Sequence, residues 1–428
     1  MNKKIEENVF WYSAKAPTLS APLSGEVTAD VVIVGGGMAG LSTAQRLREA
    51  GKDVVLVEKD FCGAGASGKT SGFITPNSEV ELSSLLATHG PEKAKKIWGF
   101  VTSGVDDIRA NIEKYKIDCD YQVQDSLFIA NDKAGMKYVE EENETRETLQ
   151  YQTRLYTDKD VQTTIGSSGY VGAVRFPNTF GMNSYLYCQA LREILINIGV
   201  RIYEDTPVTN IRDDGVTTTG GNVSAKKVVV CGDRFIPDMG VLKKEIYHVQ
   251  TFLGISKPLS DEDIKKIFPT DKMMVWDTDL VYNYYRATGG NRVLLGGGDL
   301  IYTYAPNVSN NTPRFKKRLE KYFKKKFPTI PIELEYIWPG MLGVSKDLLP
   351  IMGADEKLPN VWYVGAATGL PWAAALGKYA ADRILNGRNE YDADFSWKRK
   401  FVIGNKIQTL LTTPLTYALS HGITEYLG

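Results

Sequence analysis

The feature that most constrains this chain is a glycine-rich turn that joins an apolar run to an amphipathic helix near the amino terminus. Residues 31–34 are VVIV, a run typical of a strand that is buried on both faces of a parallel sheet. Residues 41–50 have helical spacing, and Gly51 stands where it would end the helix. A second apolar run, VVLV at residues 54–57, completes a strand–helix–strand unit.

The turn itself, GGGMAG at residues 35–40, has the spacing G-x-G-x-x-G. Glycines at this spacing permit a tight turn, let a diphosphate approach the backbone, and let the helix pack closely on the strand. The start of the helix offers N–H groups and a partial positive charge to the phosphates. Glu58 ends the second strand, 23 residues after Gly35, where its carboxylate can accept both hydroxyls of a ribose and would repel a 2′-phosphate. The unit therefore predicts a site for NAD or FAD, formed by Gly35, Gly37, Met38, Ala39, Gly40, Glu58 and Lys59.

A long loop of small residues, GAGASGKTSG at residues 63–72, follows this unit. Small side chains would let the ribityl chain and ring of a flavin lie against the backbone, so the loop favours FAD over NAD. A flexible linker is the alternative interpretation.

Alternating strands and helices return later in the chain, and segments of a different character separate them. Residues 92–165 are mostly charged amphipathic helix, whereas residues 246–304 have the period-two alternation of strands. We predict an α/β fold, with a Rossmann-like FAD-binding domain on a parallel sheet that is interrupted in sequence. The second, α+β substrate domain is predicted on a mostly antiparallel sheet. The predicted boundaries are residues 26–95, 170–235 and 338–388 for the FAD-binding domain, 96–169 and 236–337 for the substrate domain, and 389–428 for a helical tail.

Composition excludes several classes of protein. Lys and Arg number 51, and Asp and Glu also number 51, so no net charge draws the chain to nucleic acid. The four cysteines and three histidines form no zinc motif, and we expect no metal site. The first residues contain no apolar signal segment, and the uncharged stretches 358–377 and 407–424 both contain proline and several glycine, threonine or other polar residues. These observations predict a cytoplasmic protein with reduced thiols.

Several segments resemble the FAD-dependent D-amino acid oxidase and glycine oxidase superfamily, and within it the γ-glutamylputrescine oxidoreductase type. They include ADVVIVGGG at residues 29–37, GAGASGKTSGFI at 63–74, YNYYRATGGNRVLLGGGD at 282–299 and WPGMLGVSKDLLPIMG at 338–353. The resemblance covers roughly residues 8–388. It implies that the flavin nucleotide also contacts Ala66, Ser67, Lys69, Thr70, Ser71, Gly72, Val208, Gly232, Gly369, Leu370, Pro371 and Trp372.

Two segments depart from that superfamily. Many of its amino-acid oxidases have W-x-G-L-R-P, whose Arg binds the substrate carboxylate, and Leu342 stands here at that position. Leu cannot supply the paired N–H donors of a guanidinium, so glycine or a D-amino acid is not the expected substrate. The flavin turn reads ATGLPW at residues 367–372, which removes a His that the superfamily often uses. No Cys or His occupies the positions used for covalent flavin, so we expect non-covalent FAD.

The predicted reaction is oxidation of a primary or secondary amine, such as a polyamine derivative or an N-substituted amino acid. An amine C–H would deliver hydride to flavin N5, and water would hydrolyse the imine. The predicted catalytic residues are Tyr285 and Arg286, which resemble the superfamily's Y-Y-R strand, and Trp372, whose helix would direct its dipole at flavin N1. A cross-strand aromatic residue and a surface arginine are the alternative for the first two. Trp276 and Trp338 are further candidates for the cavity wall, with core packing as the alternative.

Two rival functions stay open from the sequence: a flavin-dependent hydroxy-acid dehydrogenase, and a flavin-binding subunit whose substrate site has lapsed. The electron acceptor is open between oxygen and a quinone or other acceptor. Residues 314–326, RFKKRLEKYFKKK, predict a basic helix face, and the tail after residue 401 is partly apolar. Together they suggest contact with an anionic membrane surface as a hypothesis. A solvated helix face, and docking of the tail on its own domain or on a partner subunit of an oligomer, are the alternatives.

Overall fold

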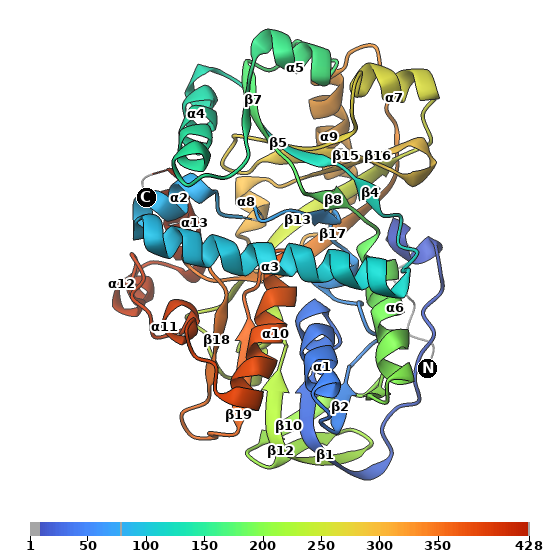
Figure 1. The fold of residues 1–428 in the computed structure, drawn as a ribbon, viewed down its shortest axis with the longest axis vertical. Helices are drawn as coiled ribbons and strands as arrows, with labels where there is room; N and C mark the ends of the chain where they lie inside the picture. Colours follow the sequence, from blue (N-terminus) through green and yellow to red (C-terminus); the bar gives the residue numbers. More distant parts are fainter. Residues whose placement is uncertain (1–8, 78, 427–428) are drawn as a thin grey trace.

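The computed structural model describes residues 9–77 and 79–426, which form two sheet-based regions (Figure 1). One sheet lies in the lower half of the view and the other in the upper half, and the long helix α3 (Pro91–Tyr115) crosses between them. This arrangement is the predicted α/β architecture of a parallel sheet with a second, mostly antiparallel one.

The first sheet is built on five parallel strands in the order β19–β12–β1–β2–β9. Antiparallel strands extend it, because β11 pairs with β12 and β10, and β18 pairs with β19. Helices α1 (Met38–Glu49), α6 (Ser184–Asn197) and α10 (Leu370–Asn386) lie side by side and contribute to one continuous buried core with α3. The strands are β1 (Gly25–Val34), β2 (Val54–Val57), β9 (Arg201–Tyr203), β10 (Val208–Arg212), β11 (Gly215–Thr218), β12 (Gly221–Val230), β18 (Ile351–Ala354) and β19 (Val361–Gly365).

The second sheet has eight strands in the order β17–β13–β16–β15–β14–β5–β7–β6, and only the β14–β5 pair is parallel. Helix α9 (Thr312–Lys326) covers one face with the buried residues Phe315, Leu319 and Phe323. The strands are β5 (Asp125–Ala130), β6 (Arg154–Thr157), β7 (Gly172–Phe176), β13 (Tyr247–Ser256), β14 (Met273–Asp277), β15 (Asn283–Thr288), β16 (Arg292–Gly297) and β17 (Leu334–Val344). The other helices of this region are α4 (Lys133–Thr148), α5 (Asp158–Thr164), α7 (Asp261–Ile267) and α8 (Leu300–Thr303).

The strand pairing differs from the sequence-based boundaries at two places. Strand β7 and residues 338–344 of β17 lie in segments assigned to the FAD-binding domain, but both strands pair within the second sheet. Strand β17 is an edge strand, and this explains how it accommodates Pro339, because an edge position leaves one side of the backbone without a ladder partner. Residues 338–344 of β17 thus belong to the second sheet by their pairing with β13.

The segment after residue 388 forms three short helices that pack on the rest of the chain. They are α11 (Asp392–Phe395), α12 (Asn405–Leu410) and α13 (Thr413–Tyr426). Helix α13 contacts α2 (Leu82–His89) and β13, so at least this part of the tail docks on its own chain. Within the described residues, none of the helices has both the length and the apolar character needed to span a bilayer.

Candidate active site

The glycine-rich turn lies at the carboxyl end of β1, where a tight backbone approach requires glycine. A Cβ on Gly40 would lie 2.0 Å from the backbone oxygen of Gly35, so the helix could not begin so close to the strand with any other residue. Gly35 has a φ of +109° and also lies against the backbone oxygen of Cys231, at the end of β12. Helix α1 begins at Met38, and its N-cap residue Gly37 supplies no side-chain cap. The Met38 N–H donates to the Ser67 hydroxyl, so the other N–H groups of the first turn are the ones that can bind an anion.

Glu58 connects this turn to the segment that follows β2. Its carboxylate accepts hydrogen bonds from the backbone nitrogens of Gly36 at 2.7 Å and Asp60 at 2.9 Å. Burial raises the pKa of Glu58, although both hydrogen bonds favour its charged form. The ammonium of Lys59 lies 3.3 Å from the ring centre of Phe235, which follows β12. The predicted ribose-binding acid is therefore part of the same edge of the sheet as the turn.

The small-residue loop passes from this edge toward the second sheet and is held through its backbone. The Ser67 hydroxyl accepts from the backbone nitrogen of Met38 at 2.9 Å. Two indole N–H groups donate to loop carbonyls, Trp338 to Lys69 at 3.0 Å and Trp11 to Thr70 at 2.9 Å. The loop is therefore an ordered connection with many fixed points, unlike the flexible linker of the alternative interpretation.

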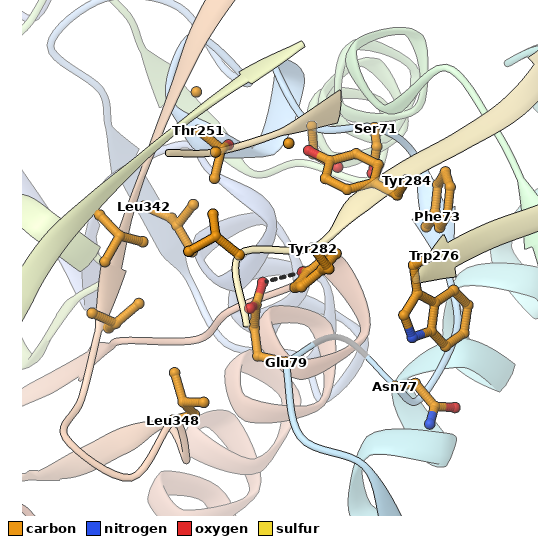
Figure 2. A pocket seen from close by; sticks show the side chains of 18 of the residues that line it. Ser71, Phe73, Asn77, Glu79, Thr251, Trp276, Tyr282, Tyr284, Leu342 and Leu348 are labelled. Carbon is orange, nitrogen blue, oxygen red and sulfur yellow. Dashed lines mark hydrogen bonds between the residues drawn. The ribbon is translucent and has the colours of Figure 1, made fainter. Parts of the chain in front are cut away.

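A cavity of about 280 Å³ lies where this loop meets the second sheet. Its walls come from the loop, from the start of α10, from strands β13, β14, β15 and β17, and from α13. Figure 2 shows Glu79 and Tyr282 directed toward one another near the centre, Phe73, Tyr284 and Trp276 on one side, and Leu342 and Leu348 on the other. The predicted cofactor residues that line it are Ala66, Ser67, Lys69, Thr70, Ser71, Gly369 and Leu370.

Of the three residues predicted to be catalytic, none is among the residues that line the cavity. Tyr285 is fully buried on the other face of its sheet, where its hydroxyl bonds to that of Tyr170 and its ring packs on Phe323 and Phe327. Its neighbour Tyr284 lines the cavity instead, because successive side chains of a strand point to opposite faces.

Arg286 and Trp372 lie just outside the cavity. The Arg286 guanidinium donates to the backbone oxygens of Ser71, Met182 and Ala287 at 2.8, 2.7 and 3.1 Å, so it holds the small-residue loop in place. Burial lowers the pKa of Arg286 to about 10. The Trp372 side chain packs against the rings of Phe100 and Phe395 in the core. Of the other tryptophans considered, Trp276 lines the cavity and Trp338 does not.

The remaining predicted cofactor residues surround this region without lining the cavity. Gly72 lies on the loop beside the Met182 oxygen, and Gly232 follows β12. Val208 begins β10 and is half-buried, while Pro371 stands in the first turn of α10. Leu342 lines the cavity from β17, as expected for the position at which the superfamily often has Arg.

Acidic side chains that were not predicted, together with aromatic ones that include the predicted wall residue Trp276, give the cavity its chemical character. Glu79 accepts from the Tyr282 hydroxyl at 3.2 Å, and Glu81 accepts from the Trp276 indole at 3.0 Å and from Asn77. Burial raises the pKa of Glu79 to about 7 and, with the nearby charge of Glu142, that of Glu81 to about 8. These side chains lie between predicted elements, so no periodic pattern marks them.

His421 and Glu425 of α13 also line the cavity and were not predicted. Both lie in the tail, and the hydrogen-bond partners of His421, Ser345 and Tyr304, are 76 and 117 residues away along the chain. Local sequence patterns contain no signal for such a contact.

The residues present fit a bound flavin nucleotide. Helix α10, like α1, begins without a side-chain cap, and the Gly369–Leu370 end of α10 lines the cavity. Two helix amino termini therefore lie at the two ends of the loop, one for a diphosphate and one for negative charge on a ring. A dinucleotide turn, a small-residue loop held by hydrogen bonds and a cavity between two sheets are the features of a flavin-dependent oxidoreductase.

Comparison with known proteins agrees with this class. The family model described as "DAO: FAD dependent oxidoreductase" matches residues 30–383. The chain belongs to this family, and its cofactor is FAD.

Relatives and solved structures extend the comparison. The chain is 28% identical to γ-glutamylputrescine oxidoreductase of Escherichia coli over 404 residues, which covers 91% of this chain and 92% of that protein. It is 26% identical to the probable oxidoreductase OrdL of Haemophilus influenzae over 410 residues, which covers 92% of this chain and 91% of that protein. Glycine oxidase from Geobacillus kaustophilus has the same fold, with a TM-score of 0.73, 20% identity, and 88% of this chain and 100% of that chain covered.

Proposed function

We propose that this protein oxidises a primary or secondary amine that enters the cavity as a cation, such as a polyamine derivative or an N-substituted amino acid. The observation that carries the proposal is the lining of the cavity, where Glu79 and Glu81 stand among the rings of Trp276, Tyr282 and Tyr284. Carboxylates and aromatic faces attract an ammonium group. A similar relative, the γ-glutamylputrescine oxidoreductase of Escherichia coli, carries an amine substrate in its name.

The position of Leu342 supports an amine without a carboxylate beside the reacting carbon. Among the described residues that line the cavity there is no arginine, and the aliphatic side chain of Leu342 cannot bind a carboxylate. For the same reason a hydroxy acid is a poorer candidate, since its carboxylate would face Glu79 and Glu81. A lapsed site is also disfavoured, because buried carboxyl groups reduce stability unless a ligand uses them.

The chain's own groups would bind, orient and deprotonate the substrate. Bound FAD supplies the hydride acceptor for the substrate C–H. An ammonium must lose one proton before its neighbouring C–H can leave as hydride, and the ionised form of Glu81, whose pKa is raised to about 8, can accept that proton. The rings of Phe73, Tyr284 and Trp276 exclude water, and the amino terminus of α10 stabilises negative charge at the cofactor. Water then hydrolyses the imine to a carbonyl compound, and releases ammonia when the substrate is a primary amine or a smaller amine when it is a secondary one.

The experiment is an anaerobic screen of the purified, FAD-loaded protein. Primary amines, secondary amines, amino acids and hydroxy acids of similar size are added, and the visible flavin spectrum is recorded. We expect amines to bleach the flavin and hydroxy acids to leave it unchanged. Bleaching by hydroxy acids alone would replace the proposed substrate class, and an unchanged spectrum with all four classes would favour a flavin-binding subunit without catalysis. Reoxidation by air or by a soluble quinone then distinguishes the two proposed electron acceptors.

Peripheral membrane contact stays a proposal beside this function. The basic helix α9 presents Lys317, Lys321, Lys324 and Lys325 outside its buried face, and the tail exposes Val402, Ile407 and Leu410. We expect the wild-type protein to sediment with anionic vesicles and the L410S variant to sediment less. Equal sedimentation with neutral and anionic vesicles would contradict a contribution of the basic helix α9 to membrane binding.

A further inference from the structure

We propose that the C-terminal helix α13 is part of the substrate site, and that Glu425 together with Glu79 binds a second cationic nitrogen of the substrate. The inference rests on the proposed amine oxidation and narrows its substrate to amines with two cationic nitrogens. Helix α13 lies beyond residue 383, where the match to the family model ends. The helix would therefore add substrate specificity to the family's shared fold.

Hydrogen bonds of two α13 side chains, His421 and Tyr417, place this helix at the cavity. The Tyr304 hydroxyl donates to Nδ1 of His421 at 2.7 Å, and Nε2 of His421 donates to the backbone oxygen of Ser345 at 2.8 Å. A carbonyl can only accept, so Nε2 carries the proton and Nδ1 is the acceptor. Burial lowers the pKa of His421 to about 4, which keeps the ring neutral. One turn earlier, buried Tyr417 donates to the backbone oxygen of Lys244 at 3.2 Å.

This anchor determines where Glu425 lies. Residues four apart share one face of a helix, so fixing His421 at the cavity brings Glu425 to the same wall. Both side chains line the cavity. Within the described part of the chain, Glu425 has no hydrogen-bond or ion-pair partner. Its carboxyl group is therefore directed at the cavity without a cation of its own.

The surroundings of Glu425 favour a cation as the missing partner. Burial and the charges of Glu79 and Glu81 raise the pKa of Glu425. Three carboxyl groups so placed oppose one another's ionisation, and a bound ammonium reverses that opposition. The basic side chains among the described lining residues are Lys69, on the cofactor loop, and the neutral His421. The protein thus supplies carboxylates and aromatic rings at this end of the cavity, and the substrate would supply the positive charge.

The two nitrogens of such a substrate would have different partners. The reacting nitrogen belongs near Leu342 and the start of α10, where the cofactor ring is expected. The second nitrogen would lie between Glu79 and Glu425, next to the rings of Tyr282 and Tyr304. An amine with one nitrogen could occupy the first position, and it would leave Glu79 and Glu425 without a cationic partner.

The test compares two probes, butylamine and 1,4-diaminobutane, by calorimetric titration of the anaerobic FAD-loaded protein. A hydrogen bond between charged groups contributes about 1.5 kcal/mol or more, so the diamine is expected to bind about 10-fold more tightly than the monoamine. E425Q keeps the shape and removes the charge, and it should abolish this difference by weakening diamine binding. E425D, which keeps the charge, should retain part of the difference in affinity between the two probes. The control E356Q changes an exposed residue away from the cavity and should bind both probes as the wild type does.

Flavin absorbance and thermal unfolding of each variant establish that it is folded and loaded. Equal affinity of the wild type for the two probes would overturn the inference, as would an E425Q variant that keeps the diamine preference. Flavin reduction is recorded in the same samples. If the diamine is preferred but neither probe bleaches the flavin, the second-cation site stands and the proposed oxidation of these amines is wrong.

Discussion

Replacement of Arg286 by Lys separates a catalytic role of this residue from a positioning role. In the structure the guanidinium donates to three backbone oxygens, those of Ser71, Met182 and Ala287, and does not line the cavity. A lysine ammonium keeps the charge but lacks the planar fork, so we expect it to lose about two of the three bonds. A hydrogen bond to a charged group contributes at least about 1.5 kcal/mol, so the loss of two such bonds costs about 3 kcal/mol.

Trp11 and Trp338 still bond to the loop through their indole N–H groups, so we expect the variant to fold. The cost should therefore appear mainly as weaker binding of the cofactor. If FAD requires the ordered loop, 3 kcal/mol corresponds to about a 100-fold higher Kd for FAD. Divided by the unfolding entropy of a chain of this length, the same energy corresponds to a Tm lower by about 3 °C.

The assay is titration of the apoprotein with FAD, followed by thermal unfolding and anaerobic flavin reduction of the saturated variant. The saturated R286K protein should reduce its flavin at close to the wild-type rate. R314K, on the exposed side of α9, is the matched control and should leave all three measurements unchanged. An R286K variant with normal FAD affinity and Tm but a strongly reduced rate of flavin reduction would refute the positioning role.

Three further predictions follow from the cofactor and substrate sites. E58A should raise the Kd for FAD by about 10- to 150-fold, because Gly36 and Asp60 lose the carboxylate that accepts their N–H groups; an unchanged Kd in a fluorescence titration would contradict this. L342R should add a carboxylate-binding group to the cavity, so spectral titration should show tighter binding of glycine and weaker binding of amines than in the wild type. The pKa of Glu79 is raised to about 7, so this carboxyl binds more protons in the folded than in the unfolded state, and its contribution to stability is lost as pH rises from about 4.5 to 7. E79Q should therefore reduce the fall in Tm of the ligand-free protein over this range, and an identical pH dependence in both proteins would count against the raised pKa.

Much of the cofactor region was predictable because its signals are local. The apolar strands, the G-x-G-x-x-G turn and Glu58 occur within a single strand–helix–strand unit, and backbone sterics link each to its conformation. The structure begins α1 at Met38, three residues before the predicted start at residue 41. The family resemblance correctly identified FAD as the cofactor.

The residues of the substrate cavity were harder to predict because their positions depend on distant parts of the chain. Strand alternation shows that Tyr284 and Tyr285 face opposite ways, but only the packing of Phe323 and Phe327 on one face decides that Tyr285 is the buried one. Arg286 bonds to Ser71, 215 residues away, and this contact favours a positioning role over a catalytic one.

The sequence by itself therefore determined the class of cofactor and the dinucleotide-binding unit, since glycine positions and the acidic residue act through the backbone nearby. Only the tertiary structure decided which side chains meet the substrate. Helix α13 illustrates the reason, because His421 reaches Tyr304 across 117 residues of chain and brings Glu425 to the cavity with it. Such a contact depends on how two sheets and a tail pack together, and that packing leaves no periodic pattern in the sequence.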